Sequence, residues 1–296
     1  MKIAVRLACL LISLFVVTPG NARGASTNNI EIIVNNTFMN TDIHSYILQG
    51  TTIVPLNVVQ NIPGIAVQWD NMTKTVTIDR DGETIKLVAG QKTATIGTQQ
   101  ILLPVASTIL KGRVMVPLRF IAESADAYVV WNAGTRRIYV AKASEELMAQ
   151  ATSAKLGEAR TAALKIPRVS SLKTLEITND TQNQNYYFPE GISNQFFIQG
   201  GPGISYFEVV GQHVEEIWTA KLNFDIKSSD SLFFLPYKIM DQDGEKPSIK
   251  GRMAYYHLML PIMEATYGFI DSTGKFTTDG QQSMTLNEIF EIPGEK

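Results

Sequence analysis

The sequence predicts an α+β protein that is mostly β, and three observations predict this fold class. The first half of the chain contains an ungapped internal repeat, in which residues 112–140 repeat the pattern of residues 50–78. A helical pattern comes next, from Ser144 to Lys165. The second half consists of short aromatic and β-branched runs separated by turn residues, which is typical of antiparallel strands. We therefore expect a duplicated module of β-hairpin, short helix and β-hairpin, then a connecting helix, then an antiparallel β-rich domain.

Length and composition are those of a globular chain with two domains. The 296 residues are 45% hydrophobic and 18% charged, and each half is long enough to bury a core of its own. The expected division is a signal peptide at 1–24, the duplicated module at 29–142, the connecting helix at 143–166 and the β-rich domain at 167–296.

The first residues have the order of a secretory signal peptide. Lys2 and Arg6 precede an apolar run at 7–17, and small residues come after it. The run is too short to span a bilayer permanently. We expect cleavage after Gly24 or Ala25, a mature chain without a transmembrane segment, and a secreted protein that is extracellular or associated with the cell wall.

The cysteine content and the charge narrow the choice of partners. Cys9 is the single cysteine and lies in the segment to be removed, so we expect a mature chain without thiol or disulfide. A lipoprotein acylated on Cys9 is the alternative. The formal charge is −2, and loss of three cations with the signal peptide changes it to −5. A mildly acidic chain without a basic block is not expected to bind nucleic acid.

Matching positions of the repeat lie 62 residues apart, as Gly50 and Gly112 do. The other matching pairs are Val54 and Val116, Pro55 and Pro117, Leu56 and Leu118, Val67 and Val129, Trp69 and Trp131, Thr73 and Thr135, and Val76 and Ile138. An ungapped match over two tryptophans and a Val-Pro-Leu core indicates a duplication. We interpret the following as structural residues of the repeat: Pro55, Trp69, Pro117, Arg119 and Trp131.

Each copy is expected to contain the same local structures. Alternating apolar residues followed by turn residues predict a hairpin that begins at Ile30 in the first copy and at Thr93 in the second. Proline suits the first turn of a helix, which predicts short helices at 56–62 and 118–125. Gly64 and Asp126 occupy the position where a left-handed residue ends a helix. Two strands around a tight turn close each copy, at 66–69 with 75–79 and at 128–131 with 137–141.

This pattern resembles the copper amine oxidase N-terminal-like domain, also called the stalk domain, over about residues 30–141. The residues that carry the resemblance are the Val-Pro-Leu-Arg-Phe-Ile-Ala-Glu run from Val116, the tryptophan at Trp131 and the Thr-Arg strand after it. The chain departs from the pattern at Asn57, where the second copy has Arg119, and at Asp126, where glycine is usual. The resemblance implies an α+β module of secreted and wall-associated bacterial proteins, where it acts as a spacer or docking unit.

The family name does not imply oxidase activity for this chain. Copper amine oxidase chemistry requires three histidines on the metal, two of them in a His-x-His pair, and a tyrosine in an Asn-Tyr-Asp/Glu context. The chain has three separate histidines, His44, His213 and His257. Tyr187 stands where the acid should come after Asn185-Tyr186. We therefore predict that the protein is not a copper amine oxidase and requires no cofactor.

The β-rich half resembles no family that we recognise, and its aromatic residues are the candidate ligand-binding groups. Aromatic strands flank the Gly200–Gly203 loop, and a stacking platform for sugar rings is one interpretation. The alternative is that these residues form the core, since aromatic side chains dominate cores as readily as binding faces. A phosphate-binding loop is not expected, because no helix comes after the glycines. The candidates are Tyr186, Tyr187, Tyr206, Phe207 and Trp218.

Metal and catalytic interpretations rest on isolated residues. Asp241 and Asp243 resemble the start of a calcium loop, but the chain then continues Glu-Lys-Pro. His213 next to two glutamates, or His257 with Glu264, has no recognised zinc spacing. No Gly-x-Ser-x-Gly elbow is present. We therefore assign no catalytic, cofactor or metal residue.

These observations predict a secreted, non-enzymatic protein of the cell envelope. In this interpretation the stalk module presents a β-rich domain that binds cell-wall polysaccharide, peptidoglycan or another envelope protein. The alternative is a secreted hydrolase of wall glycan or peptide that uses carboxylates of the second half. The candidates for that role are Glu215, Glu216, Asp241 and Glu264.

Overall fold

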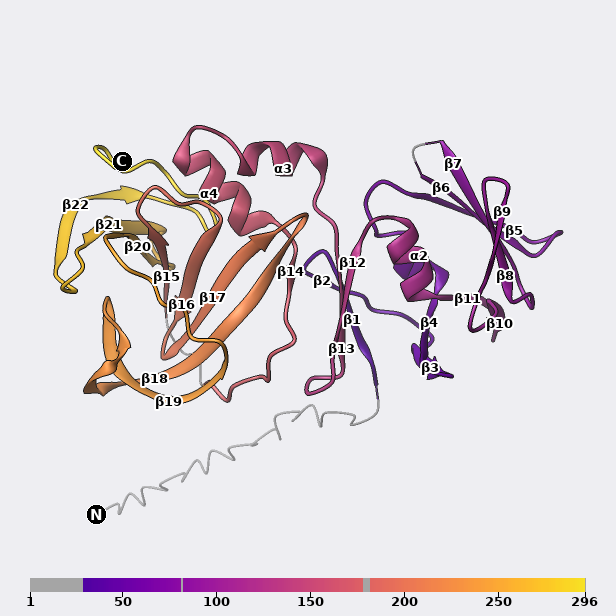
Figure 1. Cartoon of the computed structure of the whole chain (residues 1–296), viewed down its shortest axis with the longest axis horizontal. Helices are drawn as coiled ribbons and strands as arrows, with labels where there is room; N and C mark the ends of the chain where they lie inside the picture. The colour runs from indigo at the N-terminus through magenta and orange to yellow at the C-terminus, as the bar shows by residue number, and fades with distance from the viewer. Residues whose placement is uncertain (1–28, 81, 178–181, 296) are drawn as a thin grey trace, which may run out of the picture.

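The computed structural model describes residues 29–80, 82–177 and 182–295, which form two lobes side by side (Figure 1). The duplicated module forms one lobe, and the two helices that come after it lie on the β-rich second lobe. The predicted signal peptide and Cys9 lie outside the described residues. Within these residues no helix has the length and apolar character needed to cross a lipid bilayer.

Both copies of the repeat contain the predicted hairpins and short helix, and each also has a second hairpin before the helix that was not predicted. The first copy contains β1 (Glu31–Val34), β2 (Thr37–Phe38), β3 (Tyr46–Leu48), β4 (Thr51–Pro55), α1 (Leu56–Val59), β5 (Ala66–Asp70) and β6 (Thr75–Arg80). The second contains β8 (Thr93–Ile96), β9 (Gln99–Leu102), β10 (Thr108–Leu110), β11 (Arg113–Pro117), α2 (Leu118–Ser124), β12 (Tyr128–Asn132) and β13 (Arg137–Ala141). Helix α1 is shorter than the predicted 56–62, because Pro63 disfavours the helical conformation of Ile62 before it.

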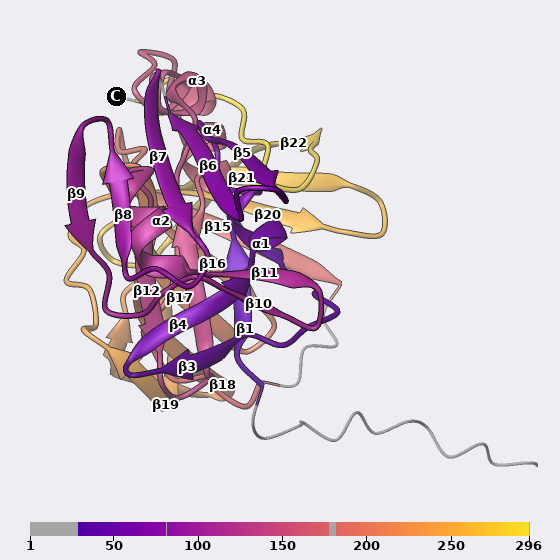
Figure 2. The same cartoon turned by 90° about the vertical axis from the view of Figure 1, so that its right-hand side faces the viewer.

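A pseudo-twofold axis relates the two copies. Strands β4 and β11 pair antiparallel, and Val54 lies directly opposite its own counterpart Val116. Both side chains are fully buried. This pair is the centre of a sheet with the order β10-β11-β4-β3 (Figure 2). The register places equivalent strands symmetrically about Val54 and Val116.

The other two sheets of the module each combine strands from both copies. One has the order β12-β13-β1-β2, and β1 of the first copy runs parallel to β13 of the second. The other has the order β5-β6-β7-β8-β9. Strand β7 (Glu83–Val88) lies between the strands that correspond to β13 and β1, so it is an insertion into one of two otherwise equivalent sheets. The copies are thus interlocked and share one core.

The backbone conformations of the turns also repeat. Left-handed residues occur in five equivalent pairs, which are Asn35 and Gly97, Gln49 and Lys111, Gly50 and Gly112, Gly64 and Asp126, and Lys74 and Arg136. The prediction for Asp126 is therefore confirmed, with a φ of 54° where Gly64 has 78°. An aspartate tolerates this conformation better than most side chains do.

The predicted single helix from 144 to 165 was wrong in two respects. It is two helices, α3 (Glu145–Ala151) and α4 (Leu156–Lys165). The break comes at Thr152, whose hydroxyl bonds back to the carbonyls of Met148 and Ala149, and at Ser153, whose hydroxyl accepts from the backbone N–H of Lys155. Helix α4 is also more than a connection, because its alanines and Leu164 are buried, and Ala163 and Leu164 belong to a core cluster of the second lobe.

The second lobe is built on a single nine-stranded sheet. The main order is β14-β18-β17-β16-β15-β20-β21-β22, with β19 paired to β18. The strands are β14 (Arg168–Val169), β15 (Asn183–Pro189), β16 (Gln195–Gly200), β17 (Gly203–Val210), β18 (His213–Leu232), β19 (Leu235–Gly244), β20 (Met253–Met259), β21 (Glu264–Ile270) and β22 (Phe276–Ser283). Residues 241–244 and 279–280 lie within β19 and β22 although their Asp and Gly residues are typical of turns. Apart from β14, the pairs are antiparallel, as predicted.

Residues 284–295, which we call the C-terminal segment, cross α4 and close one face of this sheet. The buried guanidinium of Arg160 on α4 donates to both carboxylate oxygens of Glu295, at 2.9 Å for Nη1. The guanidinium also lies 4.6 Å from the ring centre of Phe188. Gly157 allows this close approach, because a Cβ there would lie 2.9 Å from the backbone nitrogen of Glu291. The C-terminal segment is therefore part of the fold of the second lobe.

Specific contacts fix the two lobes against each other. The rings of Tyr128 and His213 stack with centroids 3.9 Å apart and planes 11° apart. The side-chain amide of Asn132 donates to the carbonyls of Ser170 and Leu172 at 3.1 and 2.7 Å. The module residues in these contacts come from β12 of the second copy, and Asn36 of the first copy adds a further contact by accepting the backbone N–H of Arg168 at 2.8 Å.

Candidate functional site

The five candidate aromatic residues of the second lobe form no exposed platform. All are buried, with exposed fractions from 0% for Tyr186 and Trp218 to 8% for Phe207. Two of them pack on the face that α4 covers, and Tyr187, Tyr206 and Trp218 pack on the opposite face. Burial raises the pKa of the Tyr187 phenol well above its ordinary value. The aromatic residues form no common platform because successive side chains of a strand point to opposite faces of the sheet. Neighbouring aromatic residues therefore enter two separate cores.

The three histidines and most of the candidate acids are dispersed, and His213 and His257 serve structural contacts. His213 lies 3.0 Å from Glu215 in the joint between the lobes. His257 contacts the Tyr187 hydroxyl at 3.1 Å, and burial lowers its pKa to about 4. Glu264 pairs in backbone register with Met259 at the start of β21. Among the described residues, no group of three histidine, cysteine or acidic side chains could hold a metal ion.

Asp241 lies in a broad hollow of about 970 Å³ beside Gly201 and Pro202. Lys173 bonds to its carboxylate at 2.7 Å and lowers its pKa, so Asp241 stays ionised. Asp243 accepts the backbone N–H of Lys173 at 2.7 Å. A general acid needs a raised pKa, so this arrangement does not provide the proton donor of a glycosidase.

Two grooves on the duplicated module are related by its pseudo-twofold axis. We call them the Trp131 groove and the Trp69 groove, with volumes of about 480 and 530 Å³. Eight positions line both, with the Trp131 groove given first: Gly50 and Gly112, Thr51 and Arg113, Thr52 and Val114, Pro104 and Asp42, Pro117 and Pro55, Leu118 and Leu56, Arg119 and Asn57, and Trp131 and Trp69. Each groove joins the tryptophan and helix start of one copy to the hairpin tip of the other. The antiparallel pairing of β4 with β11 causes this exchange, because each hairpin tip reaches the opposite helix.

The Trp131 groove is mostly apolar. Besides the shared positions it is lined by Ile47, Phe120, Glu123, Val129 and Ile138. Ile47 is 49% exposed at its edge, whereas Ile138 is buried at its base. Arg119 and Glu123 lie one helical turn apart on α2 with their charged groups 3.8 Å from each other, and both are exposed. A concave apolar surface with a few polar groups at its rim is the usual form of a binding site.

The Trp69 groove has the same frame and a polar lining. Arg113 donates from Nε to Asp42 at 2.8 Å, and these two residues replace Thr51 and Pro104 of the other groove. The arginine lowers the pKa of the Asp42 carboxyl. Asn57 and Gln60 add side-chain amides. The two grooves therefore differ in chemistry far more than in backbone.

Residues 33–140 match the family model of the copper amine oxidase N-terminal domain. The duplicated module is a domain of this family. The match begins in β1 and ends in β13, so it includes both copies of the repeat and both grooves. It leaves the β-rich lobe outside the copper amine oxidase N-terminal domain. No curated protein matches the chain.

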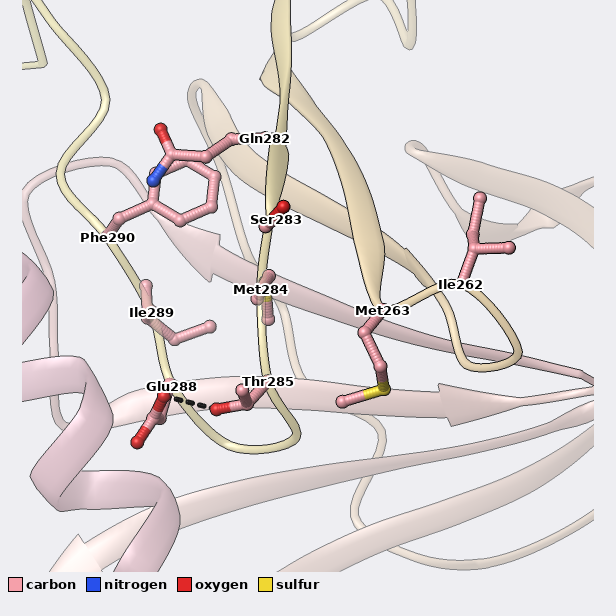
Figure 3. A pocket seen from close by; sticks show the side chains of 9 residues that line it. All are labelled: Ile262, Met263, Gln282, Ser283, Met284, Thr285, Glu288, Ile289 and Phe290. Carbon is pink, nitrogen blue, oxygen red and sulfur yellow. Dashed lines mark hydrogen bonds between the residues drawn. The ribbon is translucent and has the colours of Figure 1, made fainter.

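A hollow of about 450 Å³ on the second lobe lies outside the copper amine oxidase N-terminal domain (Figure 3). The C-terminal segment with Ile289 and Phe290 forms one side, and Ile262 and Met263 form the other. The lining contains one carboxylate, which belongs to Glu288. This carboxylate accepts a hydrogen bond from the Thr285 hydroxyl. The lining contains no second titratable group, so the hollow offers no acid–base pair.

Sequence reasoning found the residues of the grooves but not their arrangement. Pro55 and Pro117 are buried, and Trp69 and Trp131 pack against the core of the module. They also line the grooves, together with exposed Arg119, and this was missed. The available signal was the pattern of unlike residues at equivalent positions, such as Thr51 for Arg113 and Pro104 for Asp42.

Proposed function

We propose that this protein is an exported, non-enzymatic protein of the cell envelope whose Trp131 groove binds an apolar segment of another envelope protein. The observation that carries the proposal is the divergence of the two grooves on one frame. Packing of the module requires the frame in both copies, whereas it does not require an exposed apolar lining in one of them. An exposed apolar groove is a typical docking feature.

The chemistry of the Trp131 groove favours a protein over a sugar polymer. Phe120, Val129 and Trp131 offer apolar surface, and Pro104 borders it. A partner could place an aromatic or aliphatic anchor side chain there, with Arg119 and Glu123 available to polar groups around it. Such anchors in apolar pockets supply most of the binding free energy at protein interfaces. A polysaccharide would instead need hydrogen-bond partners for its hydroxyl groups.

The joint between the lobes supports a docking role for the whole chain. The stacked pair of Tyr128 and His213 at the start of β12 and the bonds of Asn132 at its end hold the second lobe against this strand. A partner bound in the Trp131 groove would therefore be held at a defined position relative to the β-rich lobe.

The test is retention of envelope material on the immobilised mature chain. Solubilised envelope proteins, purified peptidoglycan and purified wall polysaccharide are applied separately to the wild type and to the Trp131→Ala and Trp69→Ala variants. We expect one protein to be retained by the wild type and by Trp69→Ala. Its affinity for Trp131→Ala should be about thirtyfold lower, which corresponds to loss of an interface anchor.

The Trp69→Ala variant is the matched control, because it removes the same side chain from the equivalent position. Circular dichroism establishes that both variants are folded. Equal loss of retention in both variants, or retention of polysaccharide or peptidoglycan alone, would contradict a protein-binding role of the Trp131 groove.

A further inference from the structure

A cleft of about 470 Å³ between the two lobes contains cationic and amide side chains that the proposed function does not use. The β1–β2 hairpin, β13, the end of α4 and the C-terminal segment form its walls. Its polar and aromatic lining residues are Asn36, Phe38, Tyr139, Lys165, Arg168 and Asn287.

Arg168 is the central group of this cleft. Its guanidinium is partly buried, donates from Nη2 to the Leu164 carbonyl at 2.9 Å, and lies 5.3 Å from the ring centre of Phe207. The Nε atom is shielded from solvent and has no hydrogen-bond partner among the described residues. Among the residues that the structure describes, no carboxylate forms a salt bridge with the Arg168 guanidinium. Desolvation lowers the pKa of Arg168, which reflects a cation without full compensation.

The neighbouring groups add positive charge and hydrogen-bond donors. Lys165 reaches the Glu288 carboxylate only at 3.9 Å. The Oδ1 atom of Asn36 accepts the backbone N–H of Arg168 at 2.8 Å, and that of Asn287 accepts the Tyr186 hydroxyl at 3.2 Å. Each amide carbonyl is therefore engaged, which leaves the amide NH₂ groups as donors.

The opposing negative charges are few. Besides Glu288, the Glu216 carboxylate acts on Arg168 from beyond salt-bridge distance. The Leu164 carbonyl at the end of α4 supplies a partial negative charge. Neither carboxylate forms a charge-assisted bond with the guanidinium, so an added anion would still gain that interaction.

We propose that this cleft binds an oxyanion group, a carboxylate or a phosphate, carried by a small molecule with an apolar part. Arg168 and Lys165 provide the charge, Asn36 and Asn287 provide neutral donors, and the exposed ring of Phe38 provides the apolar contact. This site is separate from both grooves and does not depend on the proposed function. Because both lobes contribute residues, an anion bound there would stabilise the joint between them.

The test is thermal unfolding of the mature chain in increasing phosphate or benzoate, with chloride at the same ionic strength as reference. The two probes separate a phosphate from a carboxylate that carries an apolar group. We expect a saturable rise in Tm with at least one probe, since a ligand of the native state stabilises it according to its concentration relative to Kd. The Arg168→Gln variant should bind about tenfold more weakly or worse, because it loses a charge-assisted bond.

Two milder variants decide the outcome if Arg168→Gln does not fold. Lys165→Met removes a cation from the cleft and should weaken binding about threefold. Lys155→Met removes an exposed cation from the other end of α4 and should leave binding unchanged. No saturable rise with either probe in the wild type would overturn the proposal. Equal weakening in the two lysine variants would also overturn it, because the effect would then depend on net charge alone.

Discussion

The two copies of the repeat share a backbone frame and differ in what surrounds it. Val54 and Val116 meet at the pseudo-twofold axis, and the left-handed turn residues recur in both copies. By contrast, one groove carries an apolar lining and the other the ion pair of Asp42 with Arg113. The comparison teaches that shared residues maintain the fold, whereas the unlike residues are where to look for function.

The copies also differ in the segment that each of them leads into along the chain. The first leads into β7, which inserts into a sheet of the module. The second leads into α3 and α4, and α4 is buried in the second lobe. The chain therefore returns to the module after the last strand of the first copy. After the last strand of the second copy it passes to the β-rich lobe.

The largest effect on stability is expected at the buried ion pair that holds the C-terminal segment on α4. Glu295→Gln removes the charge that compensates Arg160, which is 0% exposed. Breaking a buried ion pair and leaving one charge behind should lower the free energy of unfolding of the second lobe by about 3–5 kcal/mol. Urea unfolding followed by circular dichroism measures the change.

Glu291→Gln is the matched control for this anchor. Glu291 is exposed on the same C-terminal segment and should tolerate the change with little loss. Similar losses in the two variants would mean that the Arg160 pair does not hold the segment on α4.

A smaller effect is expected at the axis, and it should be equal in both copies. Val54→Ala and Val116→Ala each remove two buried methyl groups from symmetric positions. Each should lower the free energy of unfolding of the module by about 2 kcal/mol through lost burial and a small cavity. Urea unfolding of the two variants side by side tests the symmetry, and clearly unequal losses would contradict it.

The smallest effect concerns the polar groove. Arg113 holds the pKa of Asp42 below the ordinary value of 3.8, mainly through the side-chain hydrogen bond. Because the folded-state pKa is lowered, any stabilisation is present above the unfolded pKa and is lost as the pH falls through the folded pKa. NMR titration of Asp42 should show a low midpoint in the wild type. The Arg113→Thr variant, which copies Thr51 of the other groove, should return the midpoint towards 3.8, and an unchanged midpoint would exclude Arg113 as the cause.

Most local structure of the module could be predicted from the sequence, because its signals are local. Helix-starting prolines, turn residues and alternating strands recur twice, and even the left-handed conformation of Asp126 was foreseen. The exchange of strands between copies could not be foreseen, since the parallel pairing of β1 with β13 depends on residues about a hundred positions apart. The hydroxyl groups of Thr152 and Ser153, which divide the predicted helix, were not weighed against its helical pattern.

The candidate sites show the limit of residue type as a guide. Aromatic residues in adjacent strand positions, such as Tyr186 and Tyr187, suggested a binding platform, yet alternation buries them on opposite faces. The Trp131 groove combines the helix of one copy with the hairpin tip of the other. Such a site exists only after the register of β4 and β11 is known.

The central claim is that the Trp131 groove and not its symmetric counterpart contacts a partner, and site-specific photocrosslinking tests it most directly. A photoreactive phenylalanine analogue replaces Ile47 at the edge of the Trp131 groove or, separately, the equivalent Ile109. These side chains are 49% and 42% exposed, so neither substitution disturbs the core. We predict that irradiation of intact envelopes joins position 47, but not position 109, to one protein. Equal products at both positions, or none at position 47, would contradict the account.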